Sequence, residues 1–182
     1  GATLRHKMRS VLSQSYPNIE HIIVDGGSTD DTMEIVHELE PDYQGRLRYI
    51  SEKDKGIYDA MNKGIAMATG DIVGILNSDD FYTGDSVLST VVSAFENGNI
   101  DAVYGDIHYV KDNDLQKCTR YYSSKLFHRR WMRLGFMPAH PSFYCRKEIY
   151  EKYGGFNLSY KIAADFECLL RLIFVHKIRL RY

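Results

Sequence analysis

The sequence has almost no excess charge, few cysteines and no long apolar run. Its 23 lysines and arginines nearly balance its 24 aspartates and glutamates, which gives a formal net charge of -1. Proteins that bind nucleic acid generally need a basic surface for the phosphates, so this balance argues against a nucleic-acid partner. No apolar stretch approaches the ~20 residues of a transmembrane helix, and no secretory leader is recognisable. The composition therefore favours neither a nucleic-acid-binding nor a membrane-spanning protein.

The three cysteines also exclude two common kinds of site. Cys118, Cys145 and Cys168 lack the close spacing of a zinc site. Because an odd number of cysteines cannot pair completely, they fit a reducing compartment better than a disulfide scaffold. We therefore expect free thiols and a cytoplasmic protein.

The length of 182 residues suits one domain with a full hydrophobic core. The hydrophobic content of 44% and the charged content of 26% are ordinary for globular proteins. We predict a single domain over residues 1–182. Gly1 leads directly into a helical pattern, so we also expect that this sequence is a piece of a longer chain.

Residues 71–80 give the most direct indication of both the fold and a binding site. Its apolar part, residues 72–76, has the length of a buried strand, and near-continuous apolarity is typical of a parallel sheet covered on both faces. Asn77, Ser78, Asp79 and Asp80 follow directly. Adjacent carboxylates repel each other, but a hard cation such as Mg²⁺ or Mn²⁺ would turn that repulsion into attraction. A polar turn before the next helix is the alternative for any single Asp-Asp pair.

Helix and strand patterns alternate through about residue 98. Helices are predicted at about residues 3–15, 28–39, 57–68 and 85–98, and strands at 20–24, 46–51 and 72–76. This alternation indicates βα units with right-handed crossovers, and hence an α/β fold. In open α/β sheets, ligands bind beyond the carboxyl ends of the strands.

Two further loops of this α/β part carry candidate binding residues. Asp25 and Gly26 close the first predicted strand, and glycine permits close approach of a ligand to the backbone. A helix N-terminus follows at Ser28, which suits the base, ribose or phosphates of a nucleotide. Lys55, at the entrance of the next helix, could face a phosphate. An ordinary strand-turn-helix joint and a solvated lysine are the alternatives.

The pattern changes after residue 98. Residues 101–110 and 118–122 alternate like antiparallel strands joined by a polar turn at 111–114, so the second half is predicted to be a mixed region that could hold a second substrate. His140 stands in a loop that enters a strand and could reach a phosphate or sugar, or serve only in structural hydrogen bonds. Asp165 begins a helix, where simple capping is the alternative to a chemical role.

Basic residues gather between residues 117 and 133. They are Lys117, Arg120, Lys125, His128, Arg129, Arg130 and Arg133. Phe127, Trp131 and Met132 lie among them. A solvated helix face would explain the cluster, and so would a site for an anionic acceptor or for the headgroups of a membrane.

Several motifs in the same order resemble those of the family 2 glycosyltransferases, which have the GT-A fold, and especially the bacterial members that build surface polysaccharides. The motifs are residues 10–20 with 23–30, 54–64, 68–71, 76–80, and 154–156 with 164–165. Residues 76–80 look like the family's Asp-X-Asp metal motif. The resemblance covers nearly the whole chain. It implies a GT-A fold with a mixed, mainly parallel sheet flanked by helices.

The resemblance also implies a reaction and roles for residues. The reaction is inverting, metal-dependent transfer of a sugar from a nucleoside-diphosphate sugar, with a UDP-sugar favoured, to a hydroxyl of a glycan or lipid-linked acceptor. Residues 1–98 would bind the donor, and residues 99–182 the acceptor. Asp25, Gly26, Lys55, Asn77 and Ser78 would contact the nucleotide sugar, Asp79 and Asp80 would hold Mn²⁺ or Mg²⁺, Asp165 would be the general base, and His140 would contact the acceptor or a phosphate.

Two features depart from the family pattern. Asn77 stands where members often carry a carboxylate, and the strand that normally precedes the first helix is absent, which indicates truncation at the N-terminus. Both favour an alternative function, a nucleotide-sugar-binding domain with weak or no catalysis, whereas Asp79, Asp80 and Asp165 favour an enzyme. A nucleotidyltransferase and an acidic phosphoacceptor domain are less favoured. The resemblance and the basic cluster together suggest a protein at the inner face of the membrane.

Overall fold

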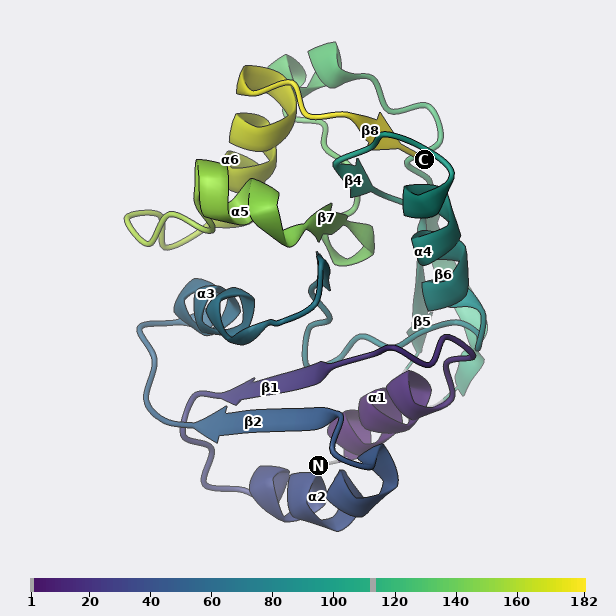
Figure 1. Cartoon of the computed structure of the whole chain (residues 1–182), viewed down its shortest axis with the longest axis vertical. Helices are drawn as coiled ribbons and strands as arrows, with labels where there is room; N and C mark the ends of the chain where they lie inside the picture. The colour runs from purple at the N-terminus through teal and green to yellow at the C-terminus, as the bar shows by residue number, and fades with distance from the viewer. Residues whose placement is uncertain (1, 112–113) are drawn as a thin grey trace.

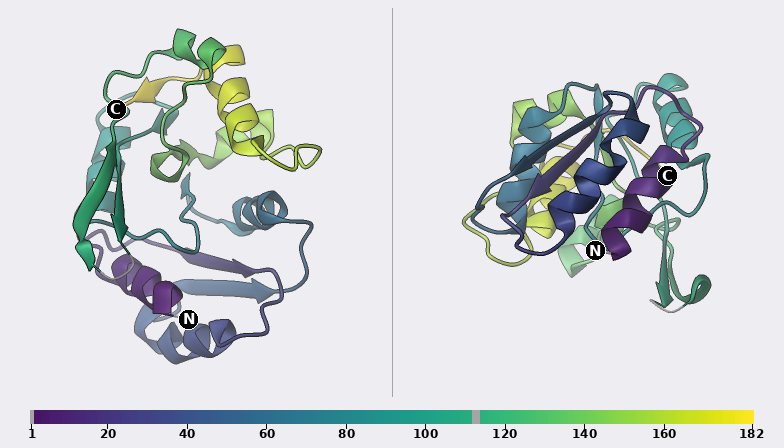
Figure 2. Two further views of the ribbon diagram at one scale, coloured as in Figure 1. Left: turned by 180° about the vertical axis from the view of Figure 1, so that it is seen from behind. Right: turned by 90° about the horizontal axis from the view of Figure 1, so that it is seen from below.

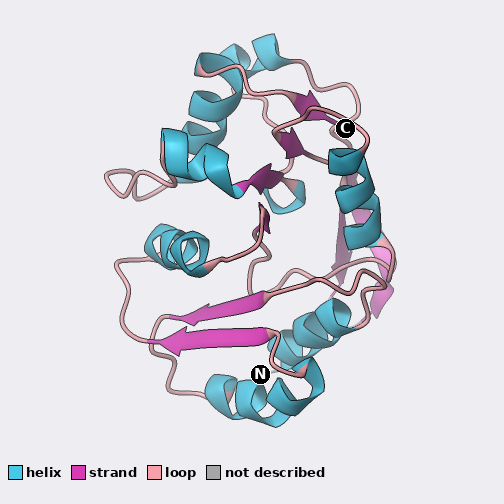
Figure 3. Cartoon of the chain, in the orientation of Figure 1, coloured by secondary structure: helices cyan, strands magenta, loops and turns pink. Residues whose placement is uncertain are grey.

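The computed structural model describes residues 2–111 and 114–182. Its helices are α1 (Ala2–Leu12), α2 (Thr32–Leu39), α3 (Ile57–Met67), α4 (Val87–Glu96), α5 (Lys147–Tyr153) and α6 (Ala164–Leu169), with short 3-10 helices η1 (Glu40–Tyr43), η2 (Arg129–Leu134) and η3 (His140–Ser142) and the π-helical η4 (Leu170–Val175). Its strands are β1 (His21–Asp25), β2 (Leu47–Ser51), β3 (Ile72–Gly74), β4 (Ala102–Val103), β5 (Ile107–Lys111), β6 (Asp114–Tyr122), β7 (Tyr144–Arg146) and β8 (Leu180–Arg181). Figures 1 and 3 show the arrangement of these elements.

The parallel strands β1 and β2 form the centre of an N-terminal layer. Helices α1 and α2 cover one face of this pair, and Ile23 packs into their common core. Successive residues of a strand point to opposite faces, so Val24 is turned toward the other side, where it approaches Gly64 of α3. The strand pair is thus held between two layers of helix, with α3 between it and the rest of the protein (Figure 1).

A second sheet has the order β3-β7-β4-β8. Strand β7 is antiparallel to both β3 and β4, and β4 is parallel to β8. Val73, Ala102 and Cys145 face the core beneath α5, α6 and η4, whereas Val103 and Tyr144 pack against α4. Both faces are therefore covered, as predicted for the strand over residues 72–76. The mixed α/β class is confirmed, with more antiparallel pairing than expected because β7 lies between β3 and β4.

Several predicted boundaries need correction. The helix predicted at 3–15 ends at Leu12, the helix predicted at 28–39 begins at Thr32, and the strand predicted at 118–122 begins at Asp114. Strand β3 ends at Gly74 rather than at residue 76, because its partner β7 begins at Tyr144, opposite Gly74. The predicted strand at 101–110 is two strands, since Ala102–Val103 pairs with β7 and β8 while Ile107–Lys111 pairs with β6. The helix expected from residue 85 begins at Val87. The turn predicted at 111–114 includes two residues outside the described ranges.

In the described part of the chain, β1 pairs only with β2, and β3 pairs only with β7. Each strand therefore has one edge without a strand partner. Such an edge is where the additional strand expected upstream of α1 would form its hydrogen bonds, and this strand stays a prediction. The β5–β6 hairpin forms a separate two-stranded sheet at the side of the molecule (Figure 2). Among the described helices, none has the length and apolarity needed to cross a bilayer.

Candidate active site

The carboxylate of Asp25 organises the loop that follows β1. Its Oδ2 atom accepts hydrogen bonds from the backbone N–H groups of Gly27 (3.2 Å) and Ser28 (3.0 Å) and from the Ser51 hydroxyl (2.6 Å), and its Oδ1 atom accepts one from the Ser28 hydroxyl. Burial raises the pKa of the Asp25 carboxyl, but these four hydrogen bonds outweigh burial and leave the pKa below its ordinary value. Asp25 thus ties the ends of β1 and β2 together as an anion.

Asp54 is a candidate that the sequence interpretation missed, although it opens one of the quoted motifs. A Cβ atom on Gly26 would lie 2.6 Å from the Asp54 Oδ2 atom, so any other residue at position 26 would require the Asp54 carboxylate to move. The Asp54 Oδ1 atom accepts a hydrogen bond from the backbone N–H of Gly56 (2.8 Å). Asp54 therefore lies beside the loop of Asp25 at the carboxyl ends of β1 and β2.

The acidic turn after β3 has a built-in hydrogen bond. The Asn77 side-chain amide donates to the Asp80 Oδ2 atom (2.8 Å). A carboxylate at position 77 would repel Asp80, so the departure from the family pattern at this position stabilises the turn. Asp79 is exposed, and its side chain forms no hydrogen bond with the described residues. Its two oxygens are open to a ligand from solution.

Lys7 supplies a positive charge next to this turn, and the sequence interpretation did not single it out. It lies on the buried face of α1, and the negative charges of Asp80 and Asp79 interact with its ammonium group. Burial lowers the pKa of the Lys7 ammonium, and the two carboxylates act in the opposite direction. The signal in the sequence was a lysine one helical turn from Leu4, on the apolar side of the predicted helix.

Asp165 lies in the first turn of α6 and is tied to α3. The Tyr58 hydroxyl donates a hydrogen bond to the Asp165 Oδ1 atom (3.1 Å). Burial, and then the negative charge of Asp165, raise the pKa of Tyr58, so the hydroxyl stays protonated and can donate. The ring of Tyr58 stacks on Phe156, with 5.7 Å between ring centroids. Tyr58 was not among the predicted residues, because the pairing joins positions 107 residues apart in the chain.

His140 lies within electrostatic range of both Asp80 in the acidic turn and Asp165. Its ring meets the edge of Phe156 at 5.8 Å between centroids. Burial lowers the pKa of His140, while the charges of Asp165 and Asp80 act to raise it. The imidazole is therefore neutral near pH 7, and the carboxylates of Asp80 and Asp165 both act on it electrostatically. The structure thus gathers Asp80, His140 and Asp165 into one region.

Two of the predicted residues are less closely connected to the rest of the proposed site. Lys55 and Ser78 are exposed. The backbone N–H of Lys55 donates to the Asp59 carboxylate (3.0 Å), which fixes the start of α3 rather than the lysine side chain. In the described ranges, no hydrogen bond or ion pair joins either side chain to Asp79 or Asp165. Their assignment to the donor stays a prediction.

The acidic turn fits a divalent cation that also binds phosphate. Among the described residues, no group of three or more His, Cys, Asp or Glu side chains could enclose a metal ion. Mg²⁺ is commonly held by one or two carboxylates, with substrate phosphates and water completing its coordination. Asp79 and Asp80 provide such a pair of carboxylates. A protein-only metal site, by contrast, would need further ligands.

Comparison with known proteins identifies the family. A family model described as "Glycosyl transferase family 2" matches residues 1–154. The chain belongs to glycosyl transferase family 2. The matched range contains the loops of Asp25, Asp54 and Asp79, and it ends before Asp165. The predicted family membership is confirmed.

Two of the relatives with curated names are glycosyltransferases of mycobacteria. A "PGL/p-HBAD biosynthesis glycosyltransferase" of Mycobacterium bovis is 29% identical over 171 residues, which are 93% of this chain and 64% of the relative. An uncharacterized glycosyltransferase of Mycobacterium tuberculosis is 36% identical over 176 residues, 94% of this chain and 64% of the relative. The family 2 chain described here thus spans less than two thirds of the length of these relatives.

Solved structures confirm the GT-A fold. A mannosyltransferase from Pyrobaculum calidifontis, in complex with GDP-Man and Mn²⁺, has a TM-score of 0.71 and 22% identity, and the match covers 98% of this chain and 50% of that one. The S. aureus protein TarS, in complex with UDP, has a TM-score of 0.76 and 17% identity, with coverage of 98% and 53%. At these identities the similarity shows the fold of the glycosyltransferase.

The hydrogen bonds of Asp25 predict a pH-dependent contribution to stability. The native pKa lies below the value of about 3.9 for an unfolded aspartate, so the contribution is present above that pH and is lost as the pH falls through the native pKa. Replacement Asp25→Asn should therefore lower the free energy of unfolding at pH 7, and this difference from wild type should shrink below about pH 4. Urea unfolding at a series of pH values measures it.

The exposed Glu96, at the end of α4, provides a control. We expect Glu96→Gln to follow the wild-type pH profile closely. A difference between wild type and Asp25→Asn that stays constant from pH 7 to pH 3 would contradict the role of the ionised Asp25 carboxylate.

Proposed function

We propose that this domain transfers a sugar from a nucleoside-diphosphate sugar to an acceptor hydroxyl with inversion, and that Asp165 is the general base. The hydrogen bond from Tyr58 to Asp165 carries the proposal. It occupies the Oδ1 atom and orients the carboxylate, so the Oδ2 atom is free to take a proton. His140, which senses both Asp165 and Asp80, supports a common site for the base and the acidic turn.

On the donor side, the loops after β1 and β2 meet at the carboxyl ends of these parallel strands, where α/β sheets bind ligands, and the acidic turn follows the carboxyl end of β3. We assign the nucleotide to the loops of Asp25, Gly26 and Asp54, and the diphosphate to the acidic turn. Asp25 retains unused acceptor capacity on its Oδ1 atom, since a carboxylate offers about four acceptor positions. Complexes of the similar structures with GDP-Man and with UDP support a nucleotide sugar, and we favour a UDP-sugar.

Each step of the reaction has a matching group in the chain. Asp79 and Asp80 would hold a divalent cation, Mn²⁺ or Mg²⁺, which when bound neutralises charge on a leaving diphosphate. Asp165 removes the proton of the acceptor hydroxyl as the oxygen attacks the anomeric carbon. The bond to the diphosphate breaks on the opposite face, so the configuration inverts in one step. Lys7, near the acidic turn, adds positive charge where the diphosphate would leave.

A nucleotide-sugar-binding domain without catalysis is the second candidate, and Asn77 in the metal motif favours it. Its amide donates to Asp80, however, and leaves the exposed Asp79 as a possible metal ligand. We therefore favour the enzyme. The acceptor that we propose for the enzyme is a glycan or a lipid-linked saccharide.

Replacement Asp165→Asn should separate turnover from donor binding. A general base contributes on the order of 10²–10⁴-fold to the rate, so kcat should fall by about that factor while the Kd for UDP with Mn²⁺ stays unchanged. The measurement is UDP release from UDP-sugars with a panel of saccharide and alkyl glycoside acceptors. Glu151→Gln is a matched control, because Glu151 forms only a surface ion pair with Lys147 on α5. Near-normal turnover in Asp165→Asn would exclude Asp165 as the base.

A basic and apolar surface around η2 supports a peripheral membrane contact. Residues 115–147 contain eight lysines and arginines and no aspartate or glutamate. We define the η2 surface by its exposed residues Lys125, Leu126, Arg130, Trp131, Leu134 and Phe136. Met132 is buried and anchors η2. In the described ranges, Lys125 and Arg130 form no ion pair, so their charges are open to anionic headgroups.

We expect the η2 surface to bind anionic headgroups at the inner face of a membrane. The protein should therefore also bind vesicles that contain anionic lipids. The protein should sediment with vesicles of phosphatidylglycerol and phosphatidylcholine at low salt and dissociate as salt is raised. The double variant Leu134→Ser/Phe136→Ser should sediment much less, whereas Leu115→Ser, an exposed leucine on β6, should behave as wild type. No sedimentation of the wild type with anionic vesicles at low salt would contradict the contact.

A further inference from the structure

Exposed apolar side chains border the proposed base. All seven residues from 157 to 163, just before α6, are exposed. Leu158 is 45% exposed, Tyr160 48% and Ile162 84%. Lys161 carries the only charge in this loop. We call Leu158, Tyr160 and Ile162 the apolar loop. A protein surface that leaves three large apolar side chains in water within eight residues of a reactive carboxylate is unusual, because such groups are normally covered by a ligand or partner.

A second element brings an apolar side chain to the same carboxylate. Ile57, the first residue of α3, is 58% exposed. The next residue, Tyr58, donates its hydroxyl hydrogen bond to Asp165. Figures 1 and 2 show α3 and the loop that carries Ile162 on the same side of the molecule. Exposed apolar residues of two separate elements therefore adjoin, along the chain, the two residues of this hydrogen bond, Tyr58 and Asp165.

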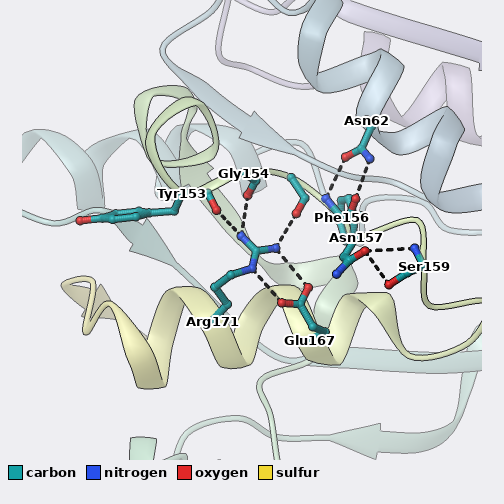
Figure 4. A network of polar contacts seen from close by, with 9 residues as sticks. Asn62, Tyr153, Gly154, Phe156, Asn157, Ser159, Glu167 and Arg171 are labelled. Atoms are coloured by element: carbon teal, nitrogen blue, oxygen red, sulfur yellow. Dashed lines mark hydrogen bonds and ion pairs between the residues drawn. The ribbon is translucent and has the colours of Figure 1, made fainter.

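The stem of the apolar loop is firmly held, as Figure 4 shows. The Arg171 guanidinium donates to three successive backbone carbonyls, those of Tyr153, Gly154 and Gly155, and it forms an ion pair with Glu167. The Asn62 side chain donates to the Phe156 carbonyl and accepts from the Phe156 N–H, both at 2.8 Å. These contacts fix the loop on α3 and α6.

The tip of the loop is shaped by local hydrogen bonds only. The Asn157 Oδ1 atom accepts from the Ser159 N–H (3.0 Å) and from the Ser159 hydroxyl (2.8 Å). At the other end, Ala163 has a φ of 64°, in the left-handed region that residues with a side chain rarely adopt. The chain turns there directly into α6 and Asp165. In the described residues, no buried core cluster includes Leu158, Tyr160 or Ile162.

We propose that the apolar loop and Ile57 bind an apolar part of the acceptor, an alkyl or aryl group close to the hydroxyl that Asp165 deprotonates. This inference rests on the proposed function and narrows its acceptor to an amphiphilic glycoside or lipid-linked sugar. The donor does not suit the apolar loop, because a nucleoside-diphosphate sugar is anionic and polar. We have assigned its binding to the loops after β1, β2 and β3. An apolar group of the acceptor would gain the most binding free energy from covering these three side chains, because burial of apolar surface is favourable.

Calorimetric titration with matched glycosides tests the inference. The probes are octyl and methyl β-D-glucoside, each added below the micelle concentration of the octyl compound, to protein saturated with UDP and Mn²⁺. The octyl glycoside should bind at least about tenfold more tightly than the methyl glycoside, because burial of even two methylene groups supplies such a factor. The variants Leu158→Ser and Ile162→Ser should lose most of that preference and keep their UDP affinity.

A control distinguishes specific binding from general binding of an amphiphile to exposed apolar groups. Val175 of η4 is also exposed, at the opposite end of the α6–η4 segment from Asp165. Val175→Ser should retain the wild-type preference for the octyl glycoside. If the three single variants lose affinity equally, the octyl group binds without specificity and the inference is wrong.

The remaining outcomes separate this inference from the proposed function. Equal affinity for octyl and methyl glycosides, with UDP bound, would overturn the apolar acceptor and leave the transferase intact. A loss of UDP affinity in Leu158→Ser and Ile162→Ser would assign the loop to the donor instead. Failure of the wild type to bind UDP with Mn²⁺ would overturn the proposed function, and the inference with it.

Discussion

The attachment of α3 to the segment that leads into α6 is the contact on which the site depends. Asn62 holds the backbone of Phe156 through two hydrogen bonds, and Tyr58 holds the Asp165 carboxylate. On its other side, α3 packs against β1, whose end carries Asp25. One helix therefore links the loops proposed for the donor to the proposed base. Loss of this attachment would separate the groups that must act together.

The protein's own side chains do not neutralise all of the negative charge at the acidic turn. Asp79 and Asp80 are adjacent like charges, and the chain offsets them with an amide from Asn77 and the buried ammonium of Lys7. Neither partner neutralises Asp79, which stays exposed. Like-charged groups in one site favour binding of a cation, so the proposed divalent metal with a diphosphate would complete the arrangement in a way that the protein's own side chains do not.

Much of the fold was predictable, because it depends on local pattern. Alternating helix and strand periods indicated the α/β class, and acidic or glycine-rich turns after strands indicated the loops of Asp25 and Asp79. Tyr58, Lys7 and Asp54 were not predicted, since their importance comes from contacts with distant parts of the chain. Strand boundaries near β3 and β4 also depended on the partner β7, which lies far along the sequence. Local propensity alone does not contain such information.

The most direct test of the central claim is calorimetric titration of the protein with UDP, GDP and dTDP, each with Mn²⁺ and with EDTA. The account predicts that one nucleotide, UDP by preference, binds with Mn²⁺ and loses its affinity when EDTA removes the metal. In Asp79→Ala, the same nucleotide should bind weakly even with Mn²⁺ present. Binding that is equal with Mn²⁺ and EDTA, or unchanged by Asp79→Ala, would contradict a metal-bridged nucleotide at the acidic turn.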